Sequence, residues 1–179
     1  IRPIHRMIAR RAPANWQERL EGTFSVSRIK LVGDANERAR ELELALSADA
    51  GNILALGLEG GTVHLLQLKN PATYAARIPE GRSEQWAAIQ PNVVRYGILE
   101  PLWEVSDEDL RAGVVEYSHD TAELLDFVDS HAEGAAFMLN PVGIDSVMLL
   151  ADQGERMPQK STFFHPKLGT GLVFHPLEP

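Results

Sequence analysis

The polar segment between Arg156 and Lys167 carries the densest set of residues that could do chemistry. It reads Arg-Met-Pro-Gln-Lys-Ser-Thr-Phe-Phe-His-Pro-Lys. Lys160 could supply a positive charge while Ser161 and Thr162 donate hydroxyl hydrogen bonds, and such groups together bind phosphate or carboxylate. The glycine spacing of a P-loop does not precede this lysine. The segment therefore predicts an anion-binding loop, with Lys167 as a second cation.

A purely structural interpretation of the same segment stays open. Two prolines bracket it, and Phe163 and Phe164 could hold it against the core as an ordinary connection. In that case both hydroxyls would bind backbone groups, and Lys160 would pair with a neighbouring carboxylate such as Asp152 or Glu155. Loops placed by a rigid scaffold often carry function, which favours the ligand interpretation.

Two histidine-containing pairs could assist the loop. They are His5-Arg6 near the start of the chain and His119, which directly precedes Asp120. A histidine beside a carboxylate can act as a general base or a metal ligand, although Asp120 also fits a helix N-cap. We expect His5, Arg6 and His119 to contribute to the anion site. No metal site is expected, because no histidine spacing is typical of metal ligands and the chain has no cysteine. No catalytic residue and no cofactor follow from these patterns.

The elements that must position these residues mix helices and strands without a regular βαβ rhythm. Alternating or short apolar runs predict strands over residues 4–9, 24–29, 53–58, 62–68, 114–117, 135–139 and 172–174. Helical periodicity predicts helices over 13–20, from 35, from 86, from 121 and over 144–151. This order favours an α+β fold with a mixed or antiparallel sheet and packed helices, in a single domain spanning 1–179.

Capping and turn signals refine these boundaries. Asp34 with Glu37, and Asp120 with Glu123, have the spacing of capping boxes. Paired glycines at 60 and 61 predict a hairpin between two strands. Pro101 is expected to end the helix that begins near residue 86, and residues 106–110 are expected to form a polar surface turn.

Composition limits the partners. The 179 residues are 44% hydrophobic and 23% charged, with a formal net charge of −8. A negative surface repels phosphate backbones and anionic lipid, so neither nucleic acid nor a membrane is expected as a partner. The absence of cysteine and of an apolar run of bilayer length favours a cytoplasmic location. Because the chain starts at Ile1 with apolar periodicity at once, we expect it to be the C-terminal half of a longer protein.

Three stretches carry a resemblance to a known family. They are Val-Glu-Tyr-Ser-His-Asp at 115–120, Ala-Ala-Phe-Met-Leu-Asn-Pro at 135–141, and Ala-Asp-Gln-Gly-Glu-Arg-Met-Pro-Gln-Lys-Ser-Thr at 151–162. With Pro-Lys-Leu at 166–168 and Ile4-His5-Arg6, they resemble the C-terminal part of a widespread uncharacterised prokaryotic family, the domain of unknown function numbered 1015. The match is strong from about residue 115 to 176 and loose between 10 and 82.

The resemblance implies an upstream half that this chain does not contain. Full-length members carry an Asp-Gly-His-His-Arg motif similar to one in ParB-like and free-serine-kinase proteins, which handle nucleotides and small phosphorylated ligands. The chain would then be the supporting half of a kinase-like enzyme or of a protein that binds a phosphorylated or carboxylated small molecule. A non-catalytic module for regulation or assembly is the alternative. The ligand-binding hypothesis predicts that Lys160 converges with Arg6 or His119 in a concave site. The assembly hypothesis predicts an exposed apolar patch.

Overall fold

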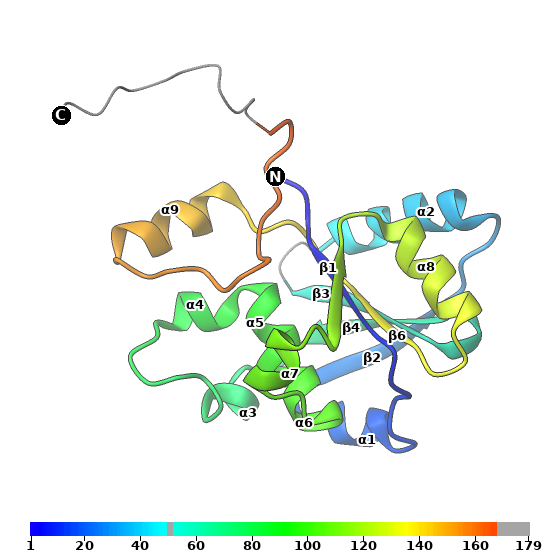
Figure 1. Ribbon diagram of the computed structural model, residues 1–179, viewed down its shortest axis with the longest axis horizontal. Helices are drawn as coiled ribbons and strands as arrows, with labels where there is room; N and C mark the ends of the chain where they lie inside the picture. Colours follow the sequence, from blue (N-terminus) through cyan, green and yellow to red (C-terminus); the bar gives the residue numbers. More distant parts are fainter. Residues whose placement is uncertain (50–51, 168–179) are drawn as a thin grey trace.

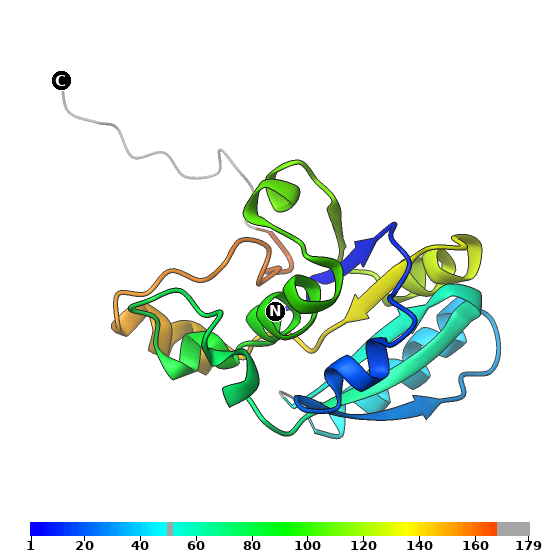
Figure 2. The same cartoon turned by 90° about the horizontal axis from the view of Figure 1, so that it is seen from below.

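An antiparallel sheet of six strands runs through the centre of the computed structural model, which describes residues 1–49 and 52–167 (Figure 1). The strands are β1 (His5–Ile8), β2 (Phe24–Ile29), β3 (Ile53–Leu58), β4 (Thr62–Leu68), β5 (Val115–Ser118) and β6 (Ala135–Met138). Their spatial order is β2-β4-β3-β6-β1-β5, and every neighbouring pair is antiparallel. Figure 2 shows this succession from below, with β2 at one edge. The predicted α+β fold is confirmed, and the sheet is antiparallel.

Helices cover both faces of the sheet (Figure 1). The helices of the described part are α1 (Trp16–Leu20), α2 (Ala35–Ser47), α3 (Ala72–Ala75), α4 (Glu84–Ala88), α5 (Gln90–Val94), α6 (Glu100–Trp103), α7 (Asp107–Arg111), α8 (Thr121–Ser130) and α9 (Ile144–Asp152). A short 3₁₀ turn, η1 (Glu59–Gly61), joins β3 to β4, and a π-helical turn, η2 (Arg95–Leu99), joins α5 to α6. Among these helices, none combines the length and apolar character needed to cross a membrane.

Alternation along the strands divides the core into two clusters, one on each sheet face. Leu54 and Leu56 face the larger cluster, which α1 and the helices from α3 to α6 cover. Ala55 faces the smaller cluster, which α2 and α8 cover. The helical side chains of the smaller cluster recur at three- and four-residue spacing: Ala39, Leu42, Leu46, Leu124, Leu125 and Val128.

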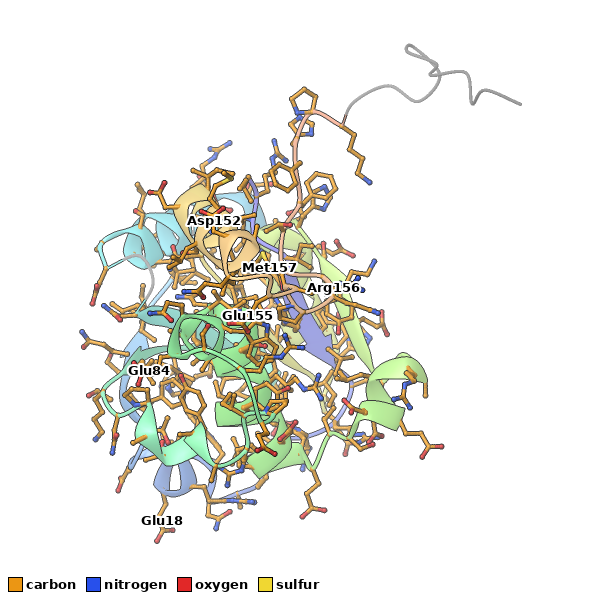
Figure 3. The ribbon with its side chains drawn as sticks, turned by 90° about the vertical axis from the view of Figure 1, so that its left-hand side faces the viewer. Glu18, Glu84, Asp152, Glu155, Arg156 and Met157 are labelled. Carbon is orange, nitrogen blue, oxygen red and sulfur yellow. The ribbon has the colours of Figure 1, made fainter. Side chains whose placement is uncertain are left out.

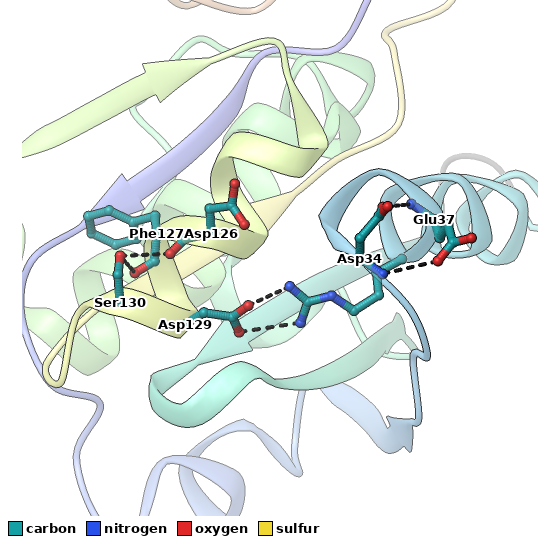
Figure 4. A network of polar contacts seen from close by, with 7 residues as sticks. Asp34, Glu37, Asp126, Phe127, Asp129 and Ser130 are labelled. Atoms are coloured by element: carbon teal, nitrogen blue, oxygen red, sulfur yellow. Dashed lines mark hydrogen bonds and ion pairs between the residues drawn. The ribbon is translucent and has the colours of Figure 1, made fainter.

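A polar network fixes α2 against α8 (Figure 4). The predicted capping box forms, because the Glu37 N–H donates to Asp34 over 2.9 Å and the Asp34 N–H donates to Glu37 over 3.1 Å. One turn later, the Arg38 guanidinium makes a two-pronged ion pair with Asp129 of α8. The sequence signal that starts α2 therefore also places the side chain that links the two helices.

Two boundaries differ from the expectation. Pro101 does not end the preceding helix, since α6 follows the π-helical turn η2 without a break and continues through Pro101 to Trp103. Residues 106–110 are not a plain turn, because Ser106 and Asp109 complete a capping box that starts α7. The predicted strand at 172–174 lies outside the described residues.

Candidate functional site

The segment that follows α9 runs along α4 before it reaches β1. Glu155 Oε1 accepts a hydrogen bond of 3.1 Å from the Ser83 N–H, and Trp86 Nε1–H donates 3.0 Å to the Arg156 carbonyl. Figure 3 labels Glu155, Arg156 and Met157 on this side of the molecule. Met157 also packs against the larger core cluster. The start of the segment is therefore held by both polar and apolar contacts.

The end of the same segment lies beside the N-terminal residues of the chain. Arg2 and Phe163 form an isolated antiparallel bridge, with N···O distances of 2.8 and 3.3 Å. The Arg6 guanidinium, from the middle of β1, donates a hydrogen bond of 3.1 Å to the Lys160 carbonyl. Segments more than 150 residues apart in the sequence are thus joined at the candidate site.

Arg6 is the most unusual electrostatic feature of this site. Its side chain is 5% exposed and donates to the carbonyls of Ile4 and Lys160, while its guanidinium lies 5.6 Å from the centre of the Tyr117 ring. Burial lowers its pKa to about 10 because desolvation disfavours the charged form. Within residues 1–49 and 52–167, no carboxylate forms an ion pair with it.

The three predicted loop residues have different environments. Lys160 is exposed and has a φ of 56°, the left-handed region that Gly or Asn usually occupies. Ser161 is buried, and its hydroxyl donates 2.7 Å to the Pro158 carbonyl, so its proton is already committed. Thr162 is half-buried, and in the described part of the chain its hydroxyl has no hydrogen-bond partner. Lys160 and Thr162 therefore remain able to bind a ligand, whereas the hydroxyl proton of Ser161 is already used within the chain.

Phe163 lies beside the remaining predicted site residues, His119 and Lys167. The His119 ring centre lies 4.6 Å from that of Phe163, and Lys167 Nζ lies 5.2 Å from it. The His165 ring lies nearly parallel to that of Phe163, with ring centres 6.2 Å apart. The structure thus brings His119, Lys167 and an additional histidine to the loop around one aromatic ring.

His5 lies on the opposite face of the sheet from Arg6. Its Nδ1 accepts a hydrogen bond of 3.0 Å from the Leu139 N–H, so the proton resides on Nε2, which lies 3.2 Å from the Thr121 hydroxyl. Thr121 in turn donates 2.7 Å to Glu43. Burial, with a smaller contribution from Arg6, lowers the pKa of His5 to about 4. His5 is therefore a neutral side chain with both nitrogens engaged, and it does not face the loop.

The predicted set therefore divides into two groups. Arg6 contacts the loop through the Lys160 carbonyl, and His119 and Lys167 contact it through the Phe163 ring, whereas His5 is bonded elsewhere. Sequence reasoning did not assign Phe163 to the site as its centre. Successive side chains of a strand point to opposite faces of the sheet, so the sequence could have indicated that His5 and Arg6 do not share a face.

Comparison of the chain with family models, with curated proteins and with solved structures finds no match. The site is therefore interpreted from its own residues. In the described part of the chain, no group of three or more His, Asp or Glu side chains is placed to hold a metal ion. What the arrangement offers is positive charge from one buried guanidinium and from exposed ammonium groups, with imidazole rings beside them.

Proposed function

We propose that the chain binds the phosphate or carboxylate group of a small molecule at the loop that contains Lys160, as the supporting half of a ligand-binding protein or kinase-like enzyme. One observation carries this proposal. Arg6 is a buried cation that has no carboxylate partner among the described residues. A buried charge is costly unless it is paired, and a bound anion would supply the missing partner.

The surroundings of Arg6 support the same class of ligand. The tether from Arg6 to the Lys160 carbonyl holds the loop beside the buried cation, while the Lys160 ammonium is exposed to an approaching anion. Lys167 and His119 flank the loop through Phe163. The loop is thus locally basic in a chain whose net charge is −8.

The test is an NMR titration of the chain with inorganic phosphate, pyrophosphate and benzoate. We expect saturable shifts of the backbone signals of Arg6 and residues 159–163. Lys160→Asn removes the ammonium and keeps a residue that tolerates a positive φ. The loss of one charge-assisted contact, roughly 1.5–3 kcal/mol, should weaken binding at least about tenfold.

Lys69→Asn is the matched control, since Lys69 is exposed and directly follows β4. It should leave the affinity unchanged. Equal affinities for the wild-type chain and Lys160→Asn would reject a ligand role for the loop. The same conclusion would follow if none of the three anions shifted the signals of residues 159–163.

A second candidate function is assembly, and helix α9 supplies the observation that favours it. Ile144 and Met148, four residues apart on one face of α9, are 52% and 56% exposed. The partner proposed for this face is the upstream half that the family resemblance implies. Ile144→Asp with Met148→Asp should leave the urea stability of this chain unchanged and abolish its association with that half supplied as a separate polypeptide. Undiminished association would reject this candidate.

A further inference from the structure

A pocket of about 240 Å³ lies between α9 and the α4–α5 pair. Ala88 and Ile89 form the wall on the α4–α5 side, and Leu149 and Leu150 form the wall on α9. The chain enters the pocket soon after β6 ends at Met138, because Asn140 and Val142 are among the residues that line it. The pocket is mostly apolar and slightly smaller than typical small-molecule sites, so it fits a single ring system or a compact part of a larger ligand.

Two buried side-chain amides give this pocket a rigid polar wall. Gln90 Nε2–H donates 2.8 Å to the Ile53 carbonyl, and Gln90 Oε1 accepts 2.8 Å from the Asn140 N–H. Asn140 Nδ2–H donates 2.9 Å to the same Ile53 carbonyl. These bonds fix the orientation of both amides, because an amide flipped at either position would place an oxygen against an oxygen.

The Asn140 side chain has unused hydrogen-bonding capacity at the pocket. It is 9% exposed, its Oδ1 receives no hydrogen bond from any described residue, and the second N–H of Nδ2 is not engaged by one either. An amide edge in this state offers one acceptor and one donor side by side. A ligand with the complementary pair, such as an amide, a lactam or a nucleobase edge, would satisfy both.

Charge distinguishes this pocket from the loop at Lys160. None of the described residues that line it carries a charged side chain. Transfer of an ion into such surroundings would cost its hydration without a compensating partner, so a charged ligand is disfavoured. We propose that the pocket binds an uncharged ring-bearing small molecule, or the uncharged ring of a larger one, through an amide-like edge that pairs with Asn140.

Benzamide and benzoate provide a matched pair of probes, since they share a ring and differ in charge. Titrated into the full chain and followed by NMR, benzamide should shift the signals of Asn140, Val142, Ser146 and Leu149 in a saturable way. Benzoate should not shift them, whereas the anion site proposed above predicts that benzoate shifts residues 159–163. The two proposals can therefore fail independently of each other.

Variants that fill the pocket from two separate walls complete the experiment. Ala88→Phe, on α4, and Ser146→Phe, on α9, should each abolish the benzamide-induced shifts. Ile144→Phe is the control, because it adds the same ring to an exposed position of α9 that does not line the pocket. Benzamide shifts that persist in a filled variant that remains folded, or that never appear in the wild-type chain, would overturn the proposal.

Discussion

The buried imidazole of His5 should make the stability of the protein depend on pH. Its pKa of 6.5 in the unfolded chain falls to about 4 in the folded chain, so unfolding takes up a proton between these two pH values. Stability is therefore full above pH 6.5 and is lost as the pH falls towards 4. This pKa shift corresponds to a loss of about 3 kcal/mol in the free energy of unfolding over that pH range. The lowered pKa of His64 acts in the same direction.

Urea unfolding at pH 7 and pH 4.5 measures this effect. The His5→Asn variant has no titrating side chain at position 5. The amide Oδ1 that it introduces can accept a hydrogen bond from the Leu139 N–H, as Nδ1 of His5 does. We expect the variant to be less stable at pH 7 and to lose most of the difference between the two pH values. A variant as sensitive to pH as the wild-type chain would show that His5 is not responsible.

The backbone conformation of Lys160 in the loop is strained. A side chain at a φ of 56° is strained, whereas glycine is not. Lys160→Gly should therefore preserve the free energy of unfolding or raise it by up to about 1 kcal/mol. Gln159→Gly, next to it and without a positive φ, should lower it by about 0.5–1 kcal/mol. Urea midpoints of both variants check the prediction, and a clear loss of stability in Lys160→Gly would contradict it.

At the level of single residues, part of the candidate site followed from the sequence. Residue type indicated Lys160 and Lys167 as the cations of an anion site, with His5, Arg6 and His119 as assisting residues. The commitment of the Ser161 hydroxyl to Pro158 did not follow, because a hydroxyl can serve backbone and ligand equally well until the turn geometry is known.

At the level of elements, the capping box of α2 permits a direct test. Asp34→Ala removes the acceptor of the Glu37 N–H and leaves a helix donor without a partner. The expected cost is about 1 kcal/mol in the free energy of unfolding. Asn36→Ala, at an exposed position of the first turn of the same helix, is the control and should change stability little. Equal stabilities of the two variants, measured by urea unfolding, would argue against a capping contribution.

The boundaries of most elements followed from short-range patterns. The ranges 24–29, 53–58 and 62–68 coincide with β2, β3 and β4, because each alternates or stays apolar between clear turn signals. The box predicted for α8 is incomplete. Asp120 caps the helix, but Glu123 accepts a hydrogen bond from Ser118 instead of from the cap N–H. The spacing of Asp120 and Glu123 could not show that a neighbouring side chain, Ser118, competes for the Glu123 carboxylate.

At the level of the whole molecule, the order of strands predicts one cooperative unfolding transition. β6 lies between β3 and β1, and β1 lies between β6 and β5, so the two halves of the chain share one sheet. Fluorescence and far-ultraviolet circular dichroism should report the same urea midpoint. Separate polypeptides of residues 1–80 and 81–179 should not fold alone. A native-like spectrum from either half, or two distinct midpoints, would contradict this prediction.

The strand order itself did not follow from the sequence. Periodicity identifies which residues face a core but carries no information on which strands pair over long distances. The bridge between Arg2 and Phe163 and the tether from Arg6 to Lys160 are contacts of this long-range kind. For that reason Lys167 and His119 could be named from the sequence as candidates, whereas their position beside Phe163 required the structure.

The position of β1 also sets an order of events during synthesis on the ribosome. β2, β3 and β4 can pair once residue 68 has emerged, but β1, made before all of them, lacks both neighbours until β5 and β6 appear. At ordinary translation speeds this interval is on the order of ten seconds. Throughout it, Met7 and Ile8, both buried in the finished protein, remain uncovered on the nascent chain. Of the six strands in this sheet, the one translated first is thus among the last to pair, and nascent-chain chaperones have time to bind it.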